Sequence, residues 1–225
     1  QEGFIAVHAT GVDPDGGTTP SWELVQFDAE PRDDIEFASA LIDLVVADWC
    51  GDETRIYSTG MSNGGLFTAE LICNLADRIA AGVSVAGLSH AETCEPSRPV
   101  PYAAYHGTAD NVVPFGGDDP SVLLPPEAVT ALIGDGTPNE FAEFAADFGC
   151  APAPESTTET AEVLRYDYTG CDDGVPMTFY EIVDGGHTWP SSPLADPNLG
   201  LEVTGFTFDV DATADAWAFM SQHTL

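Results

Sequence analysis

Apolar and polar positions along this chain switch repeatedly between a helical spacing and short continuous runs, which predicts alternating helices and buried strands. Between Asp33 and Trp49 the apolar residues follow helical spacing, with two acidic residues where the helix dipole favours negative charge. A strand is predicted over Arg55–Thr59 and a helix over Gly65–Leu75. Further strands are predicted at 3–11, 81–88, 100–107, 161–168 and 177–183, and further helices at 139–148 and 212–223.

This alternation is typical of an α/β domain with a mainly parallel sheet, whose ligands bind at the carboxyl ends of the strands. The chain of 225 residues is expected to form one domain, residues 1–225. Residues 116–138 are rich in Gly, Pro and Asp around a short apolar segment, and they are expected to form a small cap beside the site. Residues 151–160 are predicted to be a solvated loop.

The charge balance is extreme. The chain has 38 acidic residues and only five basic ones, all arginine, for a formal net charge of −33. Small soluble domains commonly carry about 2 to 8 net charges. Nucleic acid is excluded as a partner because phosphate binding needs clustered Lys and Arg, and an anionic membrane surface would repel the protein. The acidic surface resembles an adaptation to high salt, where counterions screen self-repulsion.

Five cysteines occur without a CxxC or zinc-type cluster, so no metal site is predicted. Their wide spacing is compatible with one or two disulfides plus a free thiol, which indicates an oxidising compartment. The sequence opens without a basic, apolar leader, and none of its apolar runs is long enough to span a bilayer.

The stretch "YSTGMSNGGLF" places Ser62 in a GxSxG pattern between a predicted strand and a predicted helix. In this pattern small flanking residues allow a turn so sharp that the serine oxygen stands exposed above the sheet. The alternative is a serine that merely caps the helix. The pattern alone is weak, so the interpretation depends on the partners of the serine.

A serine nucleophile needs a base to take its proton and a carboxylate to orient that base. Asp110 and His187 follow predicted strands, lie in Gly-rich turns and come in the chain order Ser, Asp, His that α/β-hydrolase folds use. Asp110 could instead be a plain turn residue. The competing histidines are His8, His90, His106 and His223; His106 is expected to be a hydrogen-bonded core histidine, and His90 could line the cleft but breaks the chain order.

Four segments carry a resemblance to a known family: "IYSTGMSNGGLFTAELICNLADRIAAGVSVAG", "CEPSRPVPYAAYHGTADNVVPF", "DGGHTWP" and "FDVDATADAWAFMSQH". Together they resemble the polyhydroxybutyrate depolymerase and feruloyl esterase-like family of secreted α/β-hydrolases. The resemblance implies an α/β-hydrolase fold with Ser62 as nucleophile, Asp110 as acid and His187 as base.

The same resemblance implies further roles. The backbone amide of Asn63 would be an oxyanion donor, and Trp189 would lie near the substrate cleft, although a half-buried packing tryptophan is an equal alternative. Cys150 and Cys171 match a pair usual in the family, whereas the pairing among the other three cysteines stays open. The family normally has two or three strands before the point where this sequence starts, ending in a loop that donates a second oxyanion amide, and "VHATG" does not match that loop.

These inferences predict an extracellular serine ester hydrolase that works through an acyl-enzyme without cofactor or metal. Its expected substrates are short-chain, feruloyl-type or polyester carboxylic esters, preferably neutral ones. Two alternatives remain: a hydrolase remnant that binds a ligand or partner with little turnover, and a peptidase on the same scaffold. A sheet edge left uncovered by the missing strands makes a homodimer plausible.

Overall fold

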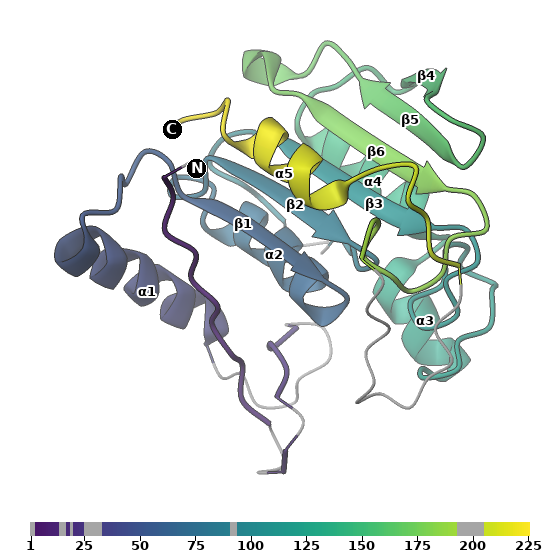
Figure 1. The fold of residues 1–225 in the computed structure, drawn as a ribbon, viewed down its shortest axis with the longest axis horizontal. Helices are drawn as coiled ribbons and strands as arrows, with labels where there is room; N and C mark the ends of the chain where they lie inside the picture. Colours follow the sequence, from purple (N-terminus) through teal and green to yellow (C-terminus); the bar gives the residue numbers. More distant parts are fainter. Residues whose placement is uncertain (1–2, 14–16, 19, 25–32, 91–93, 193–204) are drawn as a thin grey trace.

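The computed structural model describes residues 3–13, 17–18, 20–24, 33–90, 94–192 and 205–225 (Figure 1). The helices of the described residues are α1 (Asp34–Trp49), α2 (Asn63–Asn74), α3 (Pro126–Ile133), α4 (Thr137–Asp147) and α5 (Ala212–Met220), with a 3₁₀ turn at Asp172–Gly174. The strands are β1 (Tyr57–Met61), β2 (Ala81–Val85), β3 (Tyr102–Gly107), β4 (Glu155–Thr158), β5 (Val163–Tyr168) and β6 (Met177–Ile182).

The six strands form one sheet in the order β1-β2-β3-β6-β5-β4. The first four strands of this order run parallel, and β5 and β4 are antiparallel to their neighbours. The prediction of an α/β fold with a mainly parallel sheet is therefore confirmed. Because β1, β3 and β6 run in the same direction, the segments that follow them all leave the sheet at the carboxyl ends of the parallel strands.

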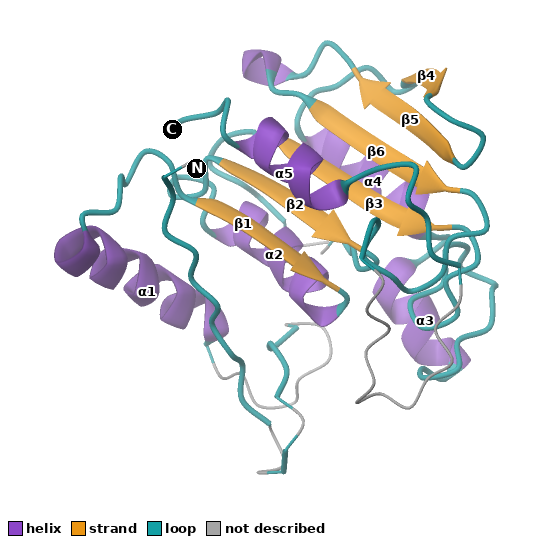
Figure 2. Ribbon diagram, in the orientation of Figure 1, coloured by secondary structure: helices purple, strands orange, loops and turns teal. Residues whose placement is uncertain are grey.

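Helices cover both faces of the sheet: α5 lies on one face and α2 and α4 on the other (Figure 2). The alternation of side chains along β3 shows why. Tyr102 and Ala104 join the core cluster of α2 and α4, whereas Ala103 and Tyr105 join the cluster beneath α5. A strand that is apolar on both faces is what a buried parallel strand requires.

A third, smaller cluster lies under α3. It joins Val129, Leu132 and Ile133 of this helix to Leu66 of α2 and to Val113, which follows β3. The helix falls within the segment 116–138 that was expected to form a cap. Its packing places it beside the edge of the sheet where β1 and β3 end (Figure 1).

Two disulfides join elements on the α2 and α4 face. Cys150 is bonded to Cys171, the pair that the resemblance implies, and Cys73 is bonded to Cys94. Cys50 is a free, exposed thiol. Each bridge closes a loop with a sequence separation of 21 residues, and such a closure stabilises a fold by about 3 kcal/mol through the lost entropy of the unfolded chain.

The prediction of a buried strand at residues 3–11 is wrong. These residues form no regular strand, and Phe4, Ile5 and Val7 are 60%, 47% and 49% exposed. The segment runs near β1 in Figure 1, but no strand ladder joins it to the described part of the sheet. An apolar run becomes a strand only where another strand accepts its backbone hydrogen bonds, and the pattern of residues does not report whether that partner is present.

The prediction that residues 151–160 form only a solvated loop is also incomplete, because β4 lies within them. The four residues of β4 are all exposed and pair only with β5, at the outer edge of the sheet. An edge strand of this kind buries neither face, so it lacks the apolar alternation by which a strand is usually found.

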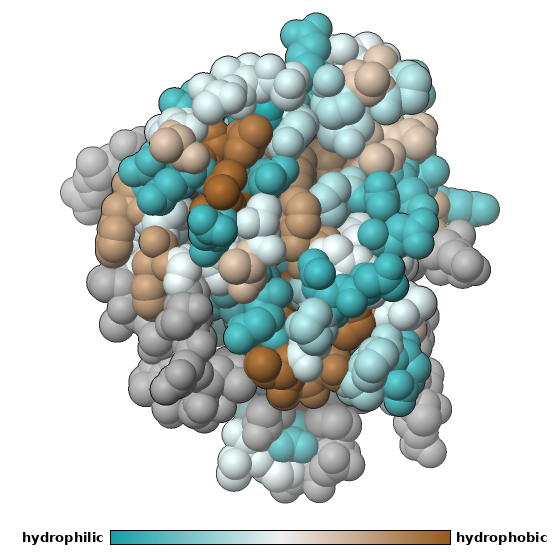
Figure 3. Space-filling model, turned by 90° about the vertical axis from the view of Figure 1, so that its right-hand side faces the viewer, coloured by the Kyte–Doolittle hydropathy of each residue, from teal (hydrophilic) through white to brown (hydrophobic). Residues whose placement is uncertain are grey.

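The face drawn in Figure 3 is mostly hydrophilic, with hydrophobic residues gathered in a few separate patches. None of the helices in the described ranges combines the length and the apolarity that crossing a membrane would take.

Candidate active site

Ser62 lies between β1 and α2 in a backbone conformation that L-residues rarely adopt, with φ 56° and ψ −125°. The backbone holds it there: its N–H donates to Val85 O at 2.9 Å, and its carbonyl accepts from Gly65 N and Leu66 N. Ser62 occupies the N-cap position of α2, but its side chain makes no capping hydrogen bond. The capping alternative is therefore not what the structure shows, and strain concentrated at a half-buried serine is typical of functional sites.

The sharp turn at Ser62 depends on glycines that let backbone pack on backbone. A Cβ at Gly60 would lie 2.3 Å from the backbone of Gly64, and a Cβ at Gly87 would lie 2.2 Å from the carbonyl oxygen of Ser62. Side chains larger than hydrogen at these two positions would push the turn away from the sheet. Gly87 follows β2, so residues distant in the sequence share in shaping the elbow.

We expect Gly60→Ala to destabilise the protein by about 1–3 kcal/mol, the usual range for overpacking a tight site. The matched control is Gly64→Ala, because a Cβ at Gly64 meets nothing within 4 Å and alanine suits a helix better than glycine. Chemical denaturation of both variants measures the difference. Equal stabilities would contradict the close packing of Gly60 on Gly64.

Asp110 and His187 form a buried pair: His187 Nδ1 lies 2.8 Å from Asp110 Oδ2, and the two residues are 4% exposed each. The other carboxylate oxygen of Asp110 accepts hydrogen bonds from the backbone N–H groups of Val112 and Val113 at 2.8 and 3.0 Å. These donors fix the plane of the carboxylate. Since a carboxylate accepts and does not donate, the proton of a neutral His187 ring lies on Nδ1 and leaves Nε2 as an acceptor.

The two loops that carry this pair are joined directly. Ala109 N donates to Gly185 O at 2.8 Å, and Asp184 N donates to Thr108 Oγ1 at 2.8 Å. Gly107 allows this contact, because a Cβ there would lie 2.2 Å from Gly185 O. The acid and the base are thus held by backbone bonds between adjacent strands β3 and β6 as well as by their own side chains.

Ser62 and the Asp110–His187 pair follow parallel strands at one edge of the sheet, but the hydrogen bonds of the described residues do not include one from Ser62 to His187. The hydrogen bond between a catalytic nucleophile and its base often tightens only when substrate binds. The structure thus brings together two of the three predicted residues and places the third after β1, with a hydroxyl that makes no hydrogen bond to the described residues.

The side chain of Asn63 has a role that the sequence did not reveal. Its carboxamide accepts from Trp22 N at 2.7 Å and donates to Trp22 O at 3.1 Å, while the Trp22 ring stacks on Phe67 of α2 at 4.6 Å. This two-point contact clamps the segment 20–24 onto the residue after Ser62. The partners are 41 residues apart, so no local pattern could have predicted the contact.

The backbone N–H of Asn63 is in the first turn of α2, and no backbone hydrogen bond of the described residues uses it. An unpaired N–H beside the nucleophile, at the positive end of a helix dipole, suits the stabilisation of a developing oxyanion. The position of Asn63 therefore agrees with the role that the resemblance implies.

Replacing Asn63 with alanine keeps this N–H but removes the clamp on Trp22. We expect the variant to lose about 1–2 kcal/mol of stability from two hydrogen bonds and on the order of tenfold in kcat/KM, because the elbow loses a support. Asn74→Ala is the control, since the side chain of Asn74 bonds, among the described residues, only to Glu70 within α2. Equal kcat/KM in the two variants would show that the clamp does not influence the elbow.

Trp189 is half-buried and packs against the core cluster beneath α5, and its indole N–H donates to Thr213 Oγ1 at 2.9 Å. These contacts are those of a packing tryptophan that ties the loop of His187 to the start of α5. Within the described residues, no contact of Trp189 favours the predicted substrate-binding role over this one.

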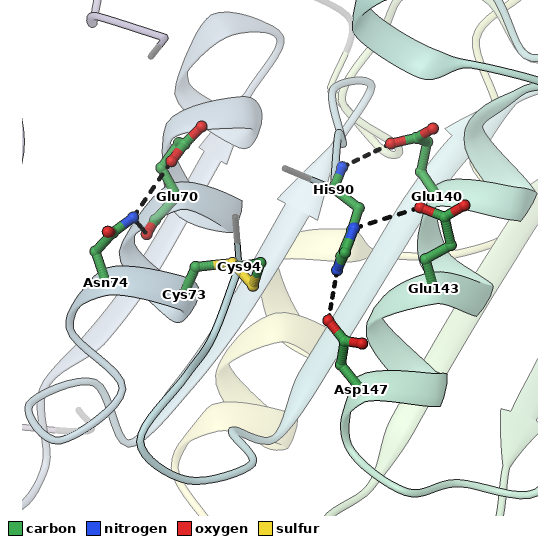
Figure 4. The surroundings of a disulfide bond; sticks show 8 residues. All are labelled: Glu70, Cys73, Asn74, His90, Cys94, Glu140, Glu143 and Asp147. Atoms are coloured by element: carbon green, nitrogen blue, oxygen red, sulfur yellow. Dashed lines mark hydrogen bonds and ion pairs between the residues drawn. A yellow bond between two sulfur atoms is a disulfide. The ribbon is translucent and has the colours of Figure 1, made fainter. Parts of the chain in front are cut away.

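The other histidines differ in their surroundings. His8 is exposed, His223 follows α5, and His106 is buried beside Asp110. His90 follows β2 and contacts α4. Its backbone N–H donates to Glu140, and its ring nitrogens lie 2.7 Å from Asp147 and 3.3 Å from Glu143 (Figure 4).

The group His90, Cys94 and Asp147 has the close spacing of metal ligands. However, Cys94 is bonded to Cys73 and so offers no thiolate (Figure 4). Of this group only His90 and Asp147 could still bind a metal ion. The contacts of His90 are better explained as joining the loop after β2 to α4.

The architecture and the elbow define an α/β-hydrolase-like protein. No protein-family model matches the chain. Feruloyl esterase B from Piromyces equi is 32% identical over 160 residues, covering 69% of this chain and 29% of that protein. Feruloyl esterase D from Neurospora crassa is 26% identical over 192 residues, covering 84% and 56%, and a bifunctional acetylxylan esterase/xylanase from Neocallimastix patriciarum is 26% identical over 200 residues, covering 87% and 26%.

The chain is thus similar to feruloyl esterases, whereas the comparisons do not show the predicted resemblance to polyhydroxybutyrate depolymerases. It spans only about a quarter to just over half the length of these relatives. The solved structure of an acetyl xylan esterase from Aspergillus awamori has a TM-score of 0.48 at 13% identity, covering 83% of this chain and 66% of that one. That likeness is too weak to add to the assignment of the fold.

Proposed function

We propose that this protein is a serine carboxylic ester hydrolase with Ser62 as nucleophile, His187 as base and Asp110 as the acid that orients the base. The observation that carries the proposal is the buried Asp110–His187 hydrogen bond at the carboxyl ends of the parallel strands. Ser62 lies at the same end of the sheet, on a strained turn, and its hydroxyl makes no capping hydrogen bond. The relationship to feruloyl and acetylxylan esterases supports the same reaction class.

In the proposed reaction, Ser62 Oγ attacks the ester carbonyl while His187 Nε2 takes the hydroxyl proton. The tetrahedral intermediate collapses as His187 returns that proton to the leaving alcohol, which leaves an acyl group on Ser62. Water, activated by the same Nε2, then adds to the acyl carbonyl and releases the carboxylic acid. Asp110 remains ionised and stabilises the imidazolium form of His187 in both halves.

The backbone N–H of Asn63 is the proposed donor to the oxyanion of each tetrahedral intermediate. One such donor contributes about 3–4 kcal/mol to transition-state stabilisation in serine hydrolases. Its neighbour in the elbow, Ser62, is held by the backbone bond to Val85, so donor and nucleophile share one rigid turn.

The proposed substrates are neutral esters of short-chain or feruloyl-type acids. Each arginine of the described residues already bonds within the protein: Arg55 to Ser221 O, Arg78 to Ser39 and Asp43, Arg98 to Pro99 O and Ile79 O, and Arg165 to Glu159 and Asp167. Because these arginines are engaged within the protein and the chain carries a net charge of −33, an anionic substrate would be repelled rather than attracted. The two disulfides fit an oxidising compartment, and we propose that the enzyme acts outside the cell.

The test combines turnover with covalent labelling. The protein is assayed with 4-nitrophenyl acetate and ethyl ferulate, in dilute and in molar salt, and is then treated with a fluorophosphonate, which forms a stable adduct with an activated serine. Hydrolysis together with a single adduct mapped to Ser62 by peptide mass spectrometry is expected. An adduct on another serine, or no adduct and no hydrolysis in either salt, would reject the proposal in favour of a hydrolase remnant.

A further inference from the structure

A second histidine lies directly behind the proposed catalytic acid. His106, the second-last residue of strand β3, is 2% exposed, and its ring Nε2 lies 2.8 Å from Val113 O and 3.5 Å from Asp110 Oδ2. Its Nδ1 is buried without a partner among the described residues. His106 touches neither Ser62 nor His187 through a hydrogen bond, so the proposed mechanism does not use it.

The surroundings of His106 determine its protonation. Both neighbours of Nε2, a carbonyl and a carboxylate, are acceptors, so Nε2 must carry the proton. Burial lowers the pKa of His106, against the opposing pull of Asp110. The ring is therefore neutral, with an N–H directed at Val113 O and a bare Nδ1.

The bond to Val113 closes a small ring of interactions around the acid. Val113 accepts from His106 through its carbonyl and donates its own N–H to Asp110 Oδ1 at 3.0 Å. The turn from Asp110 to Val113 is thus fixed at both ends. The same Nε2 also lies 3.5 Å from Asp110 Oδ2, the oxygen that accepts from His187, without a hydrogen bond to it.

We propose that His106 is a positioning residue for the acid of the catalytic site. It holds the turn 110–113 through its hydrogen bond to Val113 O and keeps a polar N–H 3.5 Å from Asp110 Oδ2, so that this oxygen stays aimed at His187 Nδ1. The inference rests on the proposed function, and His106 acts through Asp110 without contacting substrate. A neutral donor suits this role because a second positive charge would compete with the imidazolium of His187 for the carboxylate.

The test compares two substitutions at this position. His106→Phe keeps a ring of similar size but removes the donor, whereas His106→Gln can place an amide N–H where Nε2–H was. We expect His106→Phe to lower kcat by about tenfold or more with KM changed less than twofold, and to move the acid limb of the kcat/KM profile to lower pH, since a misaligned Asp110 stabilises the imidazolium of His187 less. His106→Gln should recover most of kcat. His8→Phe, at an exposed histidine, should leave kcat, KM and the pH profile unchanged.

A measurement without turnover separates this inference from the proposed function. The Nδ1–H proton of His187 that is bonded to Asp110 gives a downfield proton NMR signal, which His106→Phe should shift or broaden and His106→Gln should preserve. A folded His106→Phe protein with unchanged kcat, pH profile and NMR signal would overturn the inference. If His106→Phe does not fold, a folded His106→Leu variant with an altered signal supports the inference when His106→Gln preserves the signal, and an unchanged signal in His106→Leu rejects it. Failure of the wild type to hydrolyse esters or label Ser62 would reject the proposed function while leaving the NMR comparison valid.

Discussion

Replacing Ser62 with alanine is expected to reduce kcat for ester hydrolysis on the order of 10⁴-fold or more. The variant keeps the fold because the Ser62 side chain makes no hydrogen bond among the described residues, and the turn is held by the backbone bonds to Val85, Gly65 and Leu66. Alanine has no oxygen to attack the carbonyl, and the remaining groups cannot form an acyl-enzyme. The measurement is the steady-state rate with 4-nitrophenyl acetate, corrected for spontaneous hydrolysis.

The control for this loss is Ser221→Ala, a serine at the end of α5 whose backbone carbonyl, and not its side chain, bonds to Arg55. It should hydrolyse the ester like the wild type. Wild-type activity in Ser62→Ala would mean that hydrolysis occurs at another residue, and the assignment of the active site would be wrong.

The second large effect is expected from Asp110→Asn, which should lower kcat by about 10⁴-fold, the loss that the same exchange causes in a serine protease. The direction follows from the donors around Asp110. Because Val112 N and Val113 N must still find an acceptor at the Oδ1 position, the new amide oxygen takes that place and the NH₂ group faces His187 Nδ1. His187 must then accept at Nδ1 and carry its proton on Nε2, where it can no longer take the proton of Ser62.

The matched control is Asp118→Asn, which removes the same charge from an exposed carboxylate of the neighbouring segment. Its kcat should stay close to that of the wild type. Asp110→Asn with nearly full activity at neutral pH would contradict the tautomer argument and would leave Asp110 as an ordinary turn residue.

The repeating helix and strand patterns were sufficient to predict the sheet that carries the site. The predicted helix at Asp33–Trp49 matches α1 closely, and the predicted strands at 81–88 and 100–107 contain β2 and β3. Strands β2 and β3 are buried on both faces and α1 packs its apolar side against the core, so each leaves a periodic or continuous apolar pattern in the sequence. The sequence also predicted that Ser62, Asp110 and His187 each follow a strand of the parallel sheet, and they follow β1, β3 and β6.

What could not be predicted depends on contacts between distant segments. The clamp of Asn63 on Trp22 and the bond between Cys73 and Cys94 join residues with no shared local pattern. The exposed strand β4 and the unpaired segment at 3–11 show the same limit from the other side, because pairing depends on which backbone lies alongside. His106 was expected only to be a core histidine, since its distance from the Asp110 carboxylate depends on how the turn after β3 folds back.

Helix α1 is attached to the rest of the protein more loosely than its sixteen residues suggest. Only Asp34 of this helix is buried, its apolar side packs on the edge of the α2 cluster, and Phe37, Leu44 and Trp49 remain exposed. The ion pair of Asp43 with Arg78 adds little because exposed pairs contribute about 0–1 kcal/mol. Opening of this helix alone should therefore cost much less free energy than global unfolding, so its amide protons would exchange with solvent long before those of β2 and β3.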